Sequence, residues 1–550
     1  MNYFDDFDLK GTLNDYKDML FQSKKYLLIY LVLIFVMGLS TIYGKIIFTP
    51  KFLILTFLVV ALLGIFCIVF YFLHSSDEEL YKVAFVIILS FGLVCSLIVP
   101  ICDVSDESEH LTRAEITSRG ILIPHWTGEE LGVEGLFNHT EGQVYSTARN
   151  YGAGFYTIQS MKFFQENLGG TVIETGHDTD KINNTPYLVE SAFEQNPFFG
   201  YLPQAIGIFL AKIFDLNVIW MLWLPRMFNL VFYAGVISLA IKKTPVLKMP
   251  LLAVACIPIS IYQASSVSID CMIIALGIYS IAYFIYMTQA EENSLTSKDI
   301  IIFTVICIIL GLCKLTYLAF IFLLLLVPFK NYQNDKKTVI PMIFISIAVT
   351  AVIGMLWSRY SSPTLLHSWR GSRNLVNSTL QIQYLMDNPK HGINFFKIIF
   401  TRDLRHLANG VFSFFGARQV MDHYTDKYYL VLFPLLAFLA TILLAYPKKV
   451  KFELKTRVGT FALIIIIYIA TCFIQLLTWA FIGQFNLGLS LRYFIPLIGL
   501  IPIAIWIKYN PIEKEVFDKY SIILITVFLA VMIISFATKY YLNYMTFSLF

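Results

Sequence analysis

The chain carries a long series of apolar runs, each long enough to cross a lipid bilayer as a helix. About 30 Å of hydrocarbon is spanned by roughly 20 residues that rise 1.5 Å each. Charged residues make up 14% of the chain, well below the share of about 25% in soluble domains. The sequence therefore predicts an all-α polytopic membrane protein with about 13 transmembrane helices. These helices are expected near 26–43, 52–73, 82–101, 218–241, 249–266, 268–289, 299–313, 315–329, 337–357, 428–446, 458–480, 493–508 and 520–537.

Two long polar segments interrupt this series, whereas the connections elsewhere are short. We expect them to hold whatever the protein does in water. The chain then divides into a cytoplasmic N-terminal segment (1–25), three helices (26–101), an acidic loop (102–197), a transmembrane core (198–357), a basic loop (358–427) and a C-terminal set of helices (428–550).

Lys and Arg gather before the first helix, at 242–248 and at 447–457, and the positive-inside bias places such segments in the cytoplasm. Two topologies remain open. In the first, 198–214 enters the membrane without crossing it, and every basic connection lies inside. In the second, 198–214 crosses and 299–329 forms one long bent helix. Both topologies put the two long loops outside the cytoplasm.

The acidic loop begins with DVSDESEHLTRAE at residues 103–115. Asp106, His110 and Arg113 are spaced by four and three residues, so a helix presents them on one face. Carboxylates grouped this closely repel each other, which raises at least one pKa and suits a general base or a cation site. A solvated helix exit without function explains the same composition equally well.

The second loop has nine basic and four acidic residues, and a basic segment outside the cytoplasm runs against the charge bias. Phosphate binding explains this excess, because Arg and Lys are the usual partners of phosphate oxygens. Salt bridges to the acidic loop or contacts with lipid headgroups explain it as well. The run NFFKIIF (394–400) before TRDLRHL indicates an amphipathic helix on the membrane surface.

Four ionisable residues fall within or beside apolar runs, where a charge is costly unless it faces a cavity or a partner. They are Arg226, Asp270, Lys314 and Arg492. Lys314 and Asp270 stand near expected helix ends, so their side chains can reach the membrane surface. Arg492 is the strongest functional candidate of the four.

The motifs occur in a specific order along most of the chain, from about residue 82 to 508. This order is the acidic cluster, then NPFFGYLPQAIGIFLAKIF, LPRMFNLVF, SVSID, GLCKLTY and LRYFIP. It resembles the C-type glycosyltransferase (GT-C) superfamily, and most closely the bacterial membrane-protein branch with an Asp-Glu-x-x-His signature.

The resemblance implies a GT-C-like fold and a multi-pass glycosyltransferase of the cell membrane. Such an enzyme takes a sugar from a polyprenyl-phosphate donor and transfers it, with inversion, to an extracytoplasmic glycan such as a cell-surface polysaccharide or teichoic acid. The catalytic base falls on Asp106, with Glu107 beside it and His110 completing the signature. Serines stand where that branch has prolines around the acidic pair, which makes Asp103 a second candidate base.

The leaving group of this reaction is an anionic polyprenyl phosphate, so the enzyme needs cations beside it more than a general acid. We expect Arg492 to rank first among the substrate-binding residues. The other candidates are Arg113, Arg226, Lys314, Arg402, Arg405, Arg418 and Tyr493.

No cofactor is certain. The side chains of Asp103, Asp106, Glu107 and His110 are able to hold a divalent cation, Mg or Mn, and the sequence does not decide whether they do. The expected partners are the lipid-linked donor, the glycan acceptor and the bilayer, with no nucleic acid. A transporter or flippase of a lipid-linked glycan is the rival interpretation, although the matching halves typical of many transporters are not visible.

Overall fold

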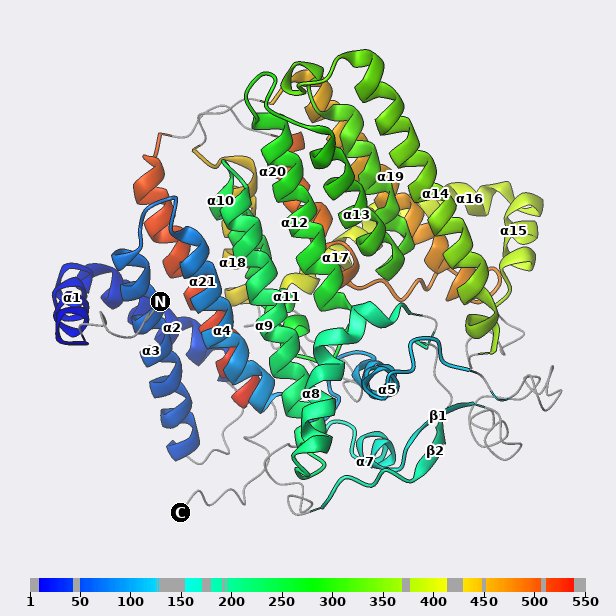
Figure 1. Cartoon of the computed structure of the whole chain (residues 1–550). Helices are drawn as coiled ribbons and strands as arrows, with labels where there is room; N and C mark the ends of the chain where they lie inside the picture. Colours follow the sequence, from blue (N-terminus) through cyan, green and yellow to red (C-terminus); the bar gives the residue numbers. More distant parts are fainter. Residues whose placement is uncertain are drawn as a thin grey trace.

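The computed structural model describes residues 9–42, 50–125, 127, 154–170, 180–189, 193–194, 196–367, 376–412, 429–447, 452–505 and 511–538. Most of these residues are helical (Figure 1). Within them, eight helices are long and apolar enough to cross a membrane, fewer than the 13 expected. These eight are α2 (Lys24–Ile42), α3 (Pro50–Leu73), α4 (Leu80–Ile98), α9 (Trp220–Lys243), α12 (Asp270–Gln289), α14 (Lys336–His367), α19 (Leu454–Thr478) and α21 (Lys514–Phe536).

The other expected apolar helices are present in shorter or altered form. The helix expected at 249–266 is broken, because Pro258 forces the preceding Ile257 into an extended conformation with φ −53° and ψ 133°. The run at 315–329 is a 3-10 helix rather than an α-helix. The elements concerned are α10 (Lys248–Ala255), α11 (Pro258–Ala264), α13 (Ser297–Cys313), η2 (Leu315–Leu326), α18 (Tyr429–Leu444) and α20 (Ile495–Ala504). The segment 198–214, whose crossing was left open, contains the short helix α8 (Leu202–Ile213).

Helix α13 and η2 form an antiparallel hairpin. The backbone N–H of Leu295, before α13, donates to the carbonyl of Asn331, after η2, at 2.8 Å. Gln333 N–H donates back to the Leu295 carbonyl at 2.9 Å. The hairpin excludes one long bent helix over 299–329. Of the two topologies, this leaves the one in which 198–214 enters the membrane without crossing it.

The lysine-bearing connections meet at one end of the helical bundle, and the acidic loop lies at the other (Figure 1). Lys248 Nζ donates to the backbone carbonyl of Asp77 at 2.7 Å, and Lys514 pairs with the carboxylate of the same residue. Tyr446 donates to Asp518 at 3.0 Å. Connections that are distant in sequence are therefore tied together at this end.

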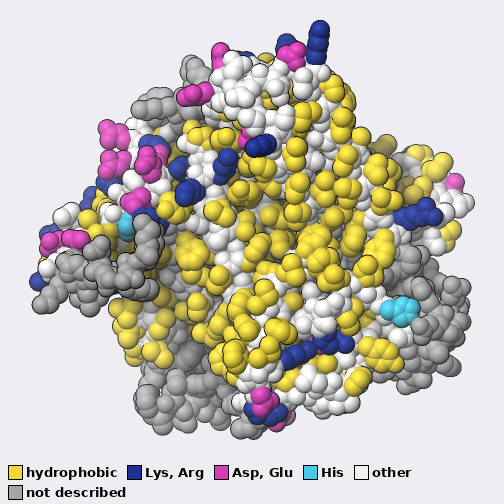
Figure 2. Space-filling view, in the orientation of Figure 1, with side chains coloured by type: hydrophobic (Ala, Val, Ile, Leu, Met, Phe, Trp, Pro, Cys, Tyr) yellow, Lys and Arg dark blue, Asp and Glu magenta, His cyan; other side chains and the backbone are white. Residues whose placement is uncertain are grey.

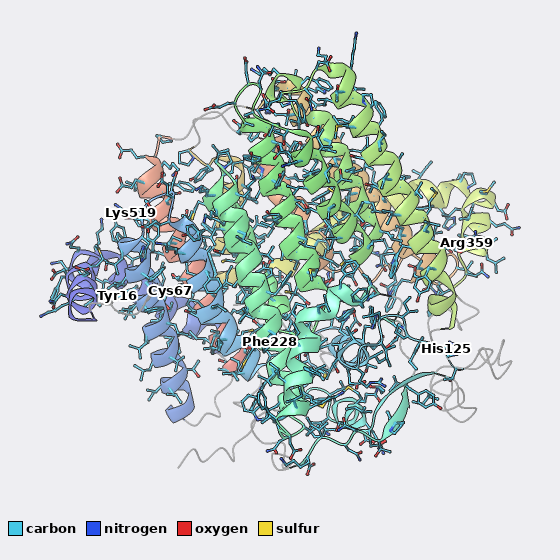
Figure 3. The ribbon with its side chains drawn as sticks, viewed as in Figure 1. Tyr16, Cys67, His125, Phe228, Arg359 and Lys519 are labelled. Carbon is cyan, nitrogen blue, oxygen red and sulfur yellow. The ribbon has the colours of Figure 1, made fainter. Side chains whose placement is uncertain are left out.

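The N-terminal segment forms a short helix, α1 (Leu9–Gln22), which packs against α3. The rings of Tyr16 and Phe66 are stacked with centroids 6.3 Å apart, and Figure 3 labels Tyr16 close to Cys67 of α3.

The described parts of the acidic loop are not wholly helical, which corrects the all-α expectation. Strands β1 (Phe155–Ile158) and β2 (Pro186–Val189) pair antiparallel, with Phe155 opposite Val189. They stand beside α5 (Glu107–Ser118) and α7 (Ser160–Glu166), and η1 (Phe198–Tyr201) leads into α8.

The described part of the basic loop begins with the last residues of α14 and continues as short helices, of which α15 packs beside α19 and η5 beside α11 and α18. A helix forms where NFFKIIF predicts one, with Phe395 buried and Phe396 exposed. The elements are α15 (Ser378–Asp387), α16 (Pro389–Ile398), the π-turn η4 (Ile399–Asp403), α17 (Leu404–Asn409) and η5 (Gly410–Phe412).

Candidate functional site

Arg492 stands between two carboxylates that come from distant parts of the chain. Its Nη2 lies 2.6 Å from Asp106 Oδ2, and its Nη1 lies 3.2 Å from Asp270 Oδ2. The Arg492 side chain is 5% exposed and that of Asp270 is 7% exposed, whereas that of Asp106 is 28% exposed. The guanidinium is thus held from two sides, and Asp106 is the carboxylate of the pair that water and ligands reach.

Local backbone geometry turns Asp106 toward Arg492. Asp106 precedes α5 and has φ 65° in the left-handed region, which Asp tolerates better than most residues. Arg492 Nη1 also donates to the carbonyl of Ser105 at 2.9 Å. Arg492 itself lies in the 3-10 turn η6 (Leu491–Tyr493) before α20. Its contact with Asp106 therefore brings the N-termini of α5 and α20 close together.

A cavity of about 310 Å³ opens beside this ion pair. Its walls come from the start of the acidic loop, the basic loop, the end of α19 and the segment before α20. The lining residues are Ser105, Asp106, His406, Gln475, Trp479, Gly488, Leu489, Ser490, Arg492 and Tyr493. Both long polar loops therefore contribute residues to one site.

Lys314 adds a second cation next to Arg492. Its Nζ lies 3.7 Å from the centroid of the Tyr493 ring, and Arg492 Cζ lies 5.2 Å from the same centroid. The Tyr317 hydroxyl donates to the Tyr493 carbonyl at 2.7 Å and fixes this backbone. A tyrosine ring thus lies within reach of two positive charges, which its π-face attracts.

Glu107 and Arg226 form a separate ion pair inside the protein, and neither side chain is exposed. Arg226 Nη2 lies 2.7 Å from Glu107 Oε2, and the same guanidinium donates to the carbonyls of Val99 and Pro100 at 2.7 and 2.8 Å. Glu107 also accepts from the Val267 N–H at 2.8 Å. The pair joins the ends of α4 and α5 to the segment before α12, away from the cavity lining.

His110 and Arg113 share a face of α5 that is buried in the acidic loop, but Asp106, which was predicted on the same face, precedes the helix and turns toward Arg492. His110 Nδ1 lies 2.6 Å from the Tyr201 hydroxyl. Arg113 donates to the carbonyls of Leu122 and Asn196 at 3.0 and 3.2 Å, and burial lowers its pKa from the ordinary value. These contacts fasten α5 to the segment before α8.

Asp103 is also turned inward. It is 1% exposed, and the Tyr262 hydroxyl lies 3.4 Å from its Oδ2. Between the two candidate bases, Asp106 is therefore the one that borders the cavity.

The arginines in the described part of the basic loop lie outside the cavity lining. Arg402 is mostly exposed, pairs with Asp403 at 2.8 Å and donates to the Phe485 carbonyl at 2.6 Å. Arg405 is exposed on α17. Arg418 lies outside the described residues.

A comparison with protein families assigns the sequence to a known group. Residues 89–501, most of the chain, match the model of the predicted membrane protein family DUF2142. The chain belongs to this family. No curated protein and no solved structure matches it. In this DUF2142 member, the matched region includes every residue that lines the cavity.

The described residues of this DUF2142 member contain no group of three or more His, Cys, Asp or Glu side chains able to hold a metal ion. The four residues considered for a cation do not converge. Glu107 faces Arg226, His110 faces Tyr201, and Asp103 faces Tyr262, which leaves Asp106 at the cavity.

Sequence reasoning missed several residues of the site. Asp270 begins helix α12, as expected, but its side chain is buried against Arg492 instead of reaching the membrane surface. Its signal was an acid within an apolar run. The others, His406, Gln475, Trp479 and Ser490, carry no distinctive pattern, because their common place depends on the fold.

Proposed function

We propose that this protein is a membrane glycosyltransferase of GT-C type, which transfers a sugar from a polyprenyl-phosphate donor to an extracytoplasmic glycan. The observation that carries the proposal is a partly exposed carboxylate, Asp106, that lines one cavity together with Arg492. A second cation, Lys314, lies outside this lining and packs against the ring of Tyr493, which does line the cavity. An inverting transfer to a hydroxyl needs a base on one side of the anomeric carbon and positive charge on the other.

Asp106 acts as the base in this mechanism. Its side chain is 28% exposed and borders the cavity, where an acceptor hydroxyl can approach the carboxylate. The acceptor hydroxyl gives its proton to Asp106 while its oxygen forms the bond to the anomeric carbon. The bond from that carbon to the phosphate oxygen breaks, and its electron pair leaves with the polyprenyl phosphate.

Arg492 and Lys314 stabilise the phosphate as its charge grows. Arg492 is suited to this because a planar guanidinium binds phosphate with two hydrogen bonds at once. Asp270 holds the guanidinium from behind, so Arg492 stays in place when its contact with Asp106 is exchanged for substrate. The adjacent wall of Trp479, Gln475 and His406 offers an aromatic face and polar groups to a sugar.

The proposed enzyme has 13 passes through the cell membrane, counting the broken segment α10–α11, the hairpin α13–η2 and the short helices α18 and α20. The end of the bundle that bears the lysines then faces the cytoplasm, as the positive-inside bias requires. Asp106, Arg492 and the cavity lie at the opposite end and face the outside of the membrane.

Proteoliposomes test this function. The full-length protein is reconstituted and supplied with undecaprenyl phosphates that carry radiolabelled glucose, galactose or N-acetylglucosamine, together with envelope glycan from cells that lack the protein. Transfer is measured as label that leaves the lipid extract and enters glycan. We expect transfer from at least one donor, and we expect Asp106→Asn to lower its rate at least a hundredfold, as typical for a lost general base.

Two controls accompany this assay. Asp103→Asn lies three residues away and is expected to keep most of the transfer rate. If Asp103→Asn abolishes transfer and Asp106→Asn does not, Asp103 is the base. Arg405→Gln changes an exposed arginine outside the cavity lining and is expected to leave the rate unchanged. Intact lipid-linked sugar that crosses the bilayer without transfer indicates the flippase instead.

A further inference from the structure

A second pocket lies at the far end of α5 from Asp106. It has a volume of about 560 Å³ and is bordered by Arg119 after α5, Tyr156 of β1 and Lys212 in the last turn of α8. Helix α5 has 12 residues, which separates the two sites by about 18 Å. None of the residues that line this pocket also lines the cavity at Arg492.

Two cations in this pocket share one buried carboxylate. Glu115 is not exposed, and its Oε1 lies 2.7 Å from Lys212 Nζ and 2.9 Å from Arg119 Nε. Thr157 donates to the other oxygen of Glu115 at 2.7 Å. The carboxylate holds both cations in position from beneath and neutralises only one, so the group keeps a net positive charge.

The cations meet neutral polar groups at the pocket surface. Arg119 Nη2 donates to the Tyr156 carbonyl at 2.6 Å, and the side chain of Tyr156 is 54% exposed. Asn184 borders the same space. Fixed cations beside polar groups suit an anionic headgroup, since charge-assisted hydrogen bonds to phosphate are stronger than neutral ones.

An apolar stripe runs along α8 up to this pocket. Leu202, Ile206, Phe209 and Ile213 follow each other at spacings of four, three and four residues and are 43–58% exposed. The opposite face of α8 packs tightly on α9, where a Cβ at Gly207 would lie 2.5 Å from the Pro225 nitrogen. Figure 2 shows hydrophobic side chains over much of the face on which Figure 1 places α8.

The pocket also lies near the membrane surface. Trp220 begins α9, only eight residues after Lys212, and its ring packs against Trp223 with centroids 5.3 Å apart. Tryptophans gather where the hydrocarbon meets the headgroups. The stripe on α8 therefore faces acyl chains, and the cations at its end lie at the level of the headgroups.

We infer that Arg119 and Lys212 bind the phosphate of an anionic phospholipid in the outer leaflet, whose acyl chains lie along the exposed stripe of α8. Basic pockets beside membrane helices bind anionic headgroups in this way. The site is independent of the proposed transfer reaction, because α5 separates it from Asp106. Its occupant fixes α5 and α8 against each other through Glu115.

The test uses the full-length protein in a neutral detergent, titrated with palmitoyl-oleoyl phosphatidylglycerol and followed by native mass spectrometry. We expect this lipid to bind at least tenfold more tightly than phosphatidylcholine. Lys212→Gln is expected to weaken it about tenfold, the effect of one charge-assisted hydrogen bond. Lys181→Gln is the matched control in the same acidic loop, since Lys181 is exposed and pairs with Asp215 outside the pocket.

Three further outcomes decide the inference. Arg119→Lys keeps the positive charge and is expected to retain most of the lipid binding. This variant shows whether binding depends on the charge at this position. Equal binding of phosphatidylglycerol to the wild type and to Lys212→Gln overturns the site. Equal affinity for free glycerol phosphate and for the full lipid overturns the role of the α8 stripe and leaves a soluble phosphate as the ligand.

Discussion

Arg492 binds Asp106 and Asp270 through different nitrogen atoms, so the site depends on the shape of its side chain as well as on its charge. We expect Arg492→Lys to lower sugar transfer at least tenfold, because a lysine ammonium is a point charge that does not span two carboxylates. Transfer rate and thermal unfolding of the variant are measured together. A lysine variant with full activity and normal unfolding contradicts the bridging role.

Glu107 and Asp106 are neighbours in sequence but differ in burial, and the difference predicts opposite defects. Glu107→Gln leaves Arg226 buried without its charged partner, which costs about 3–5 kcal/mol of folding free energy. We expect this variant to unfold at a clearly lower temperature or to be degraded in cells. Asp106→Asn removes a partly exposed carboxylate and is expected to stay folded while transfer fails. Equal unfolding temperatures for the two variants argue against this division.

The segment between α19 and α20 forms one wall of the cavity, and a glycine controls its path. Gly488 has φ 56°, and a Cβ there would lie 2.5 Å from Trp479 Nε1. We expect Gly488→Ala to strain the backbone by about 1–2 kcal/mol, displace Trp479 and lower transfer. Gly392→Ala in α16 is the matched control, because no atom lies within 4 Å of its added carbon. If Gly392→Ala loses as much activity as Gly488→Ala, the close approach of Gly488 to Trp479 does not explain the loss.

Elements were more predictable from the sequence than the contacts between them. Apolar runs located the helices because burial or lipid exposure imposes their composition. Pro258 was a visible signal for the break between α10 and α11, but the apolar run at 249–266 is long enough to be taken for one helix. The pairs Arg226–Glu107 and Arg492–Asp106 join residues 119 and 386 positions apart, and spacing along one chain does not encode such contacts. The sequence ranked Arg492 above Arg226, and only Arg492 lines the cavity, but it did not reveal that Arg226 pairs with Glu107 inside the protein.

At the scale of the whole molecule, the two topologies differ in the side of the membrane on which the connections between α9 and α13 lie. If 198–214 does not cross, Lys242 and Glu292 both face the cytoplasm; if 198–214 crosses and 299–329 passes once, both face outward. All eight native cysteines are buried, so single cysteines at exposed positions report accessibility with little background. We expect Lys181→Cys to react with a membrane-impermeant maleimide in intact cells, and Lys242→Cys and Glu292→Cys to react only after permeabilisation. If Lys242→Cys is labelled in intact cells as fast as Lys181→Cys, the end of the bundle that bears the lysines faces outward. The lysine-bearing connections would then not lie in the cytoplasm.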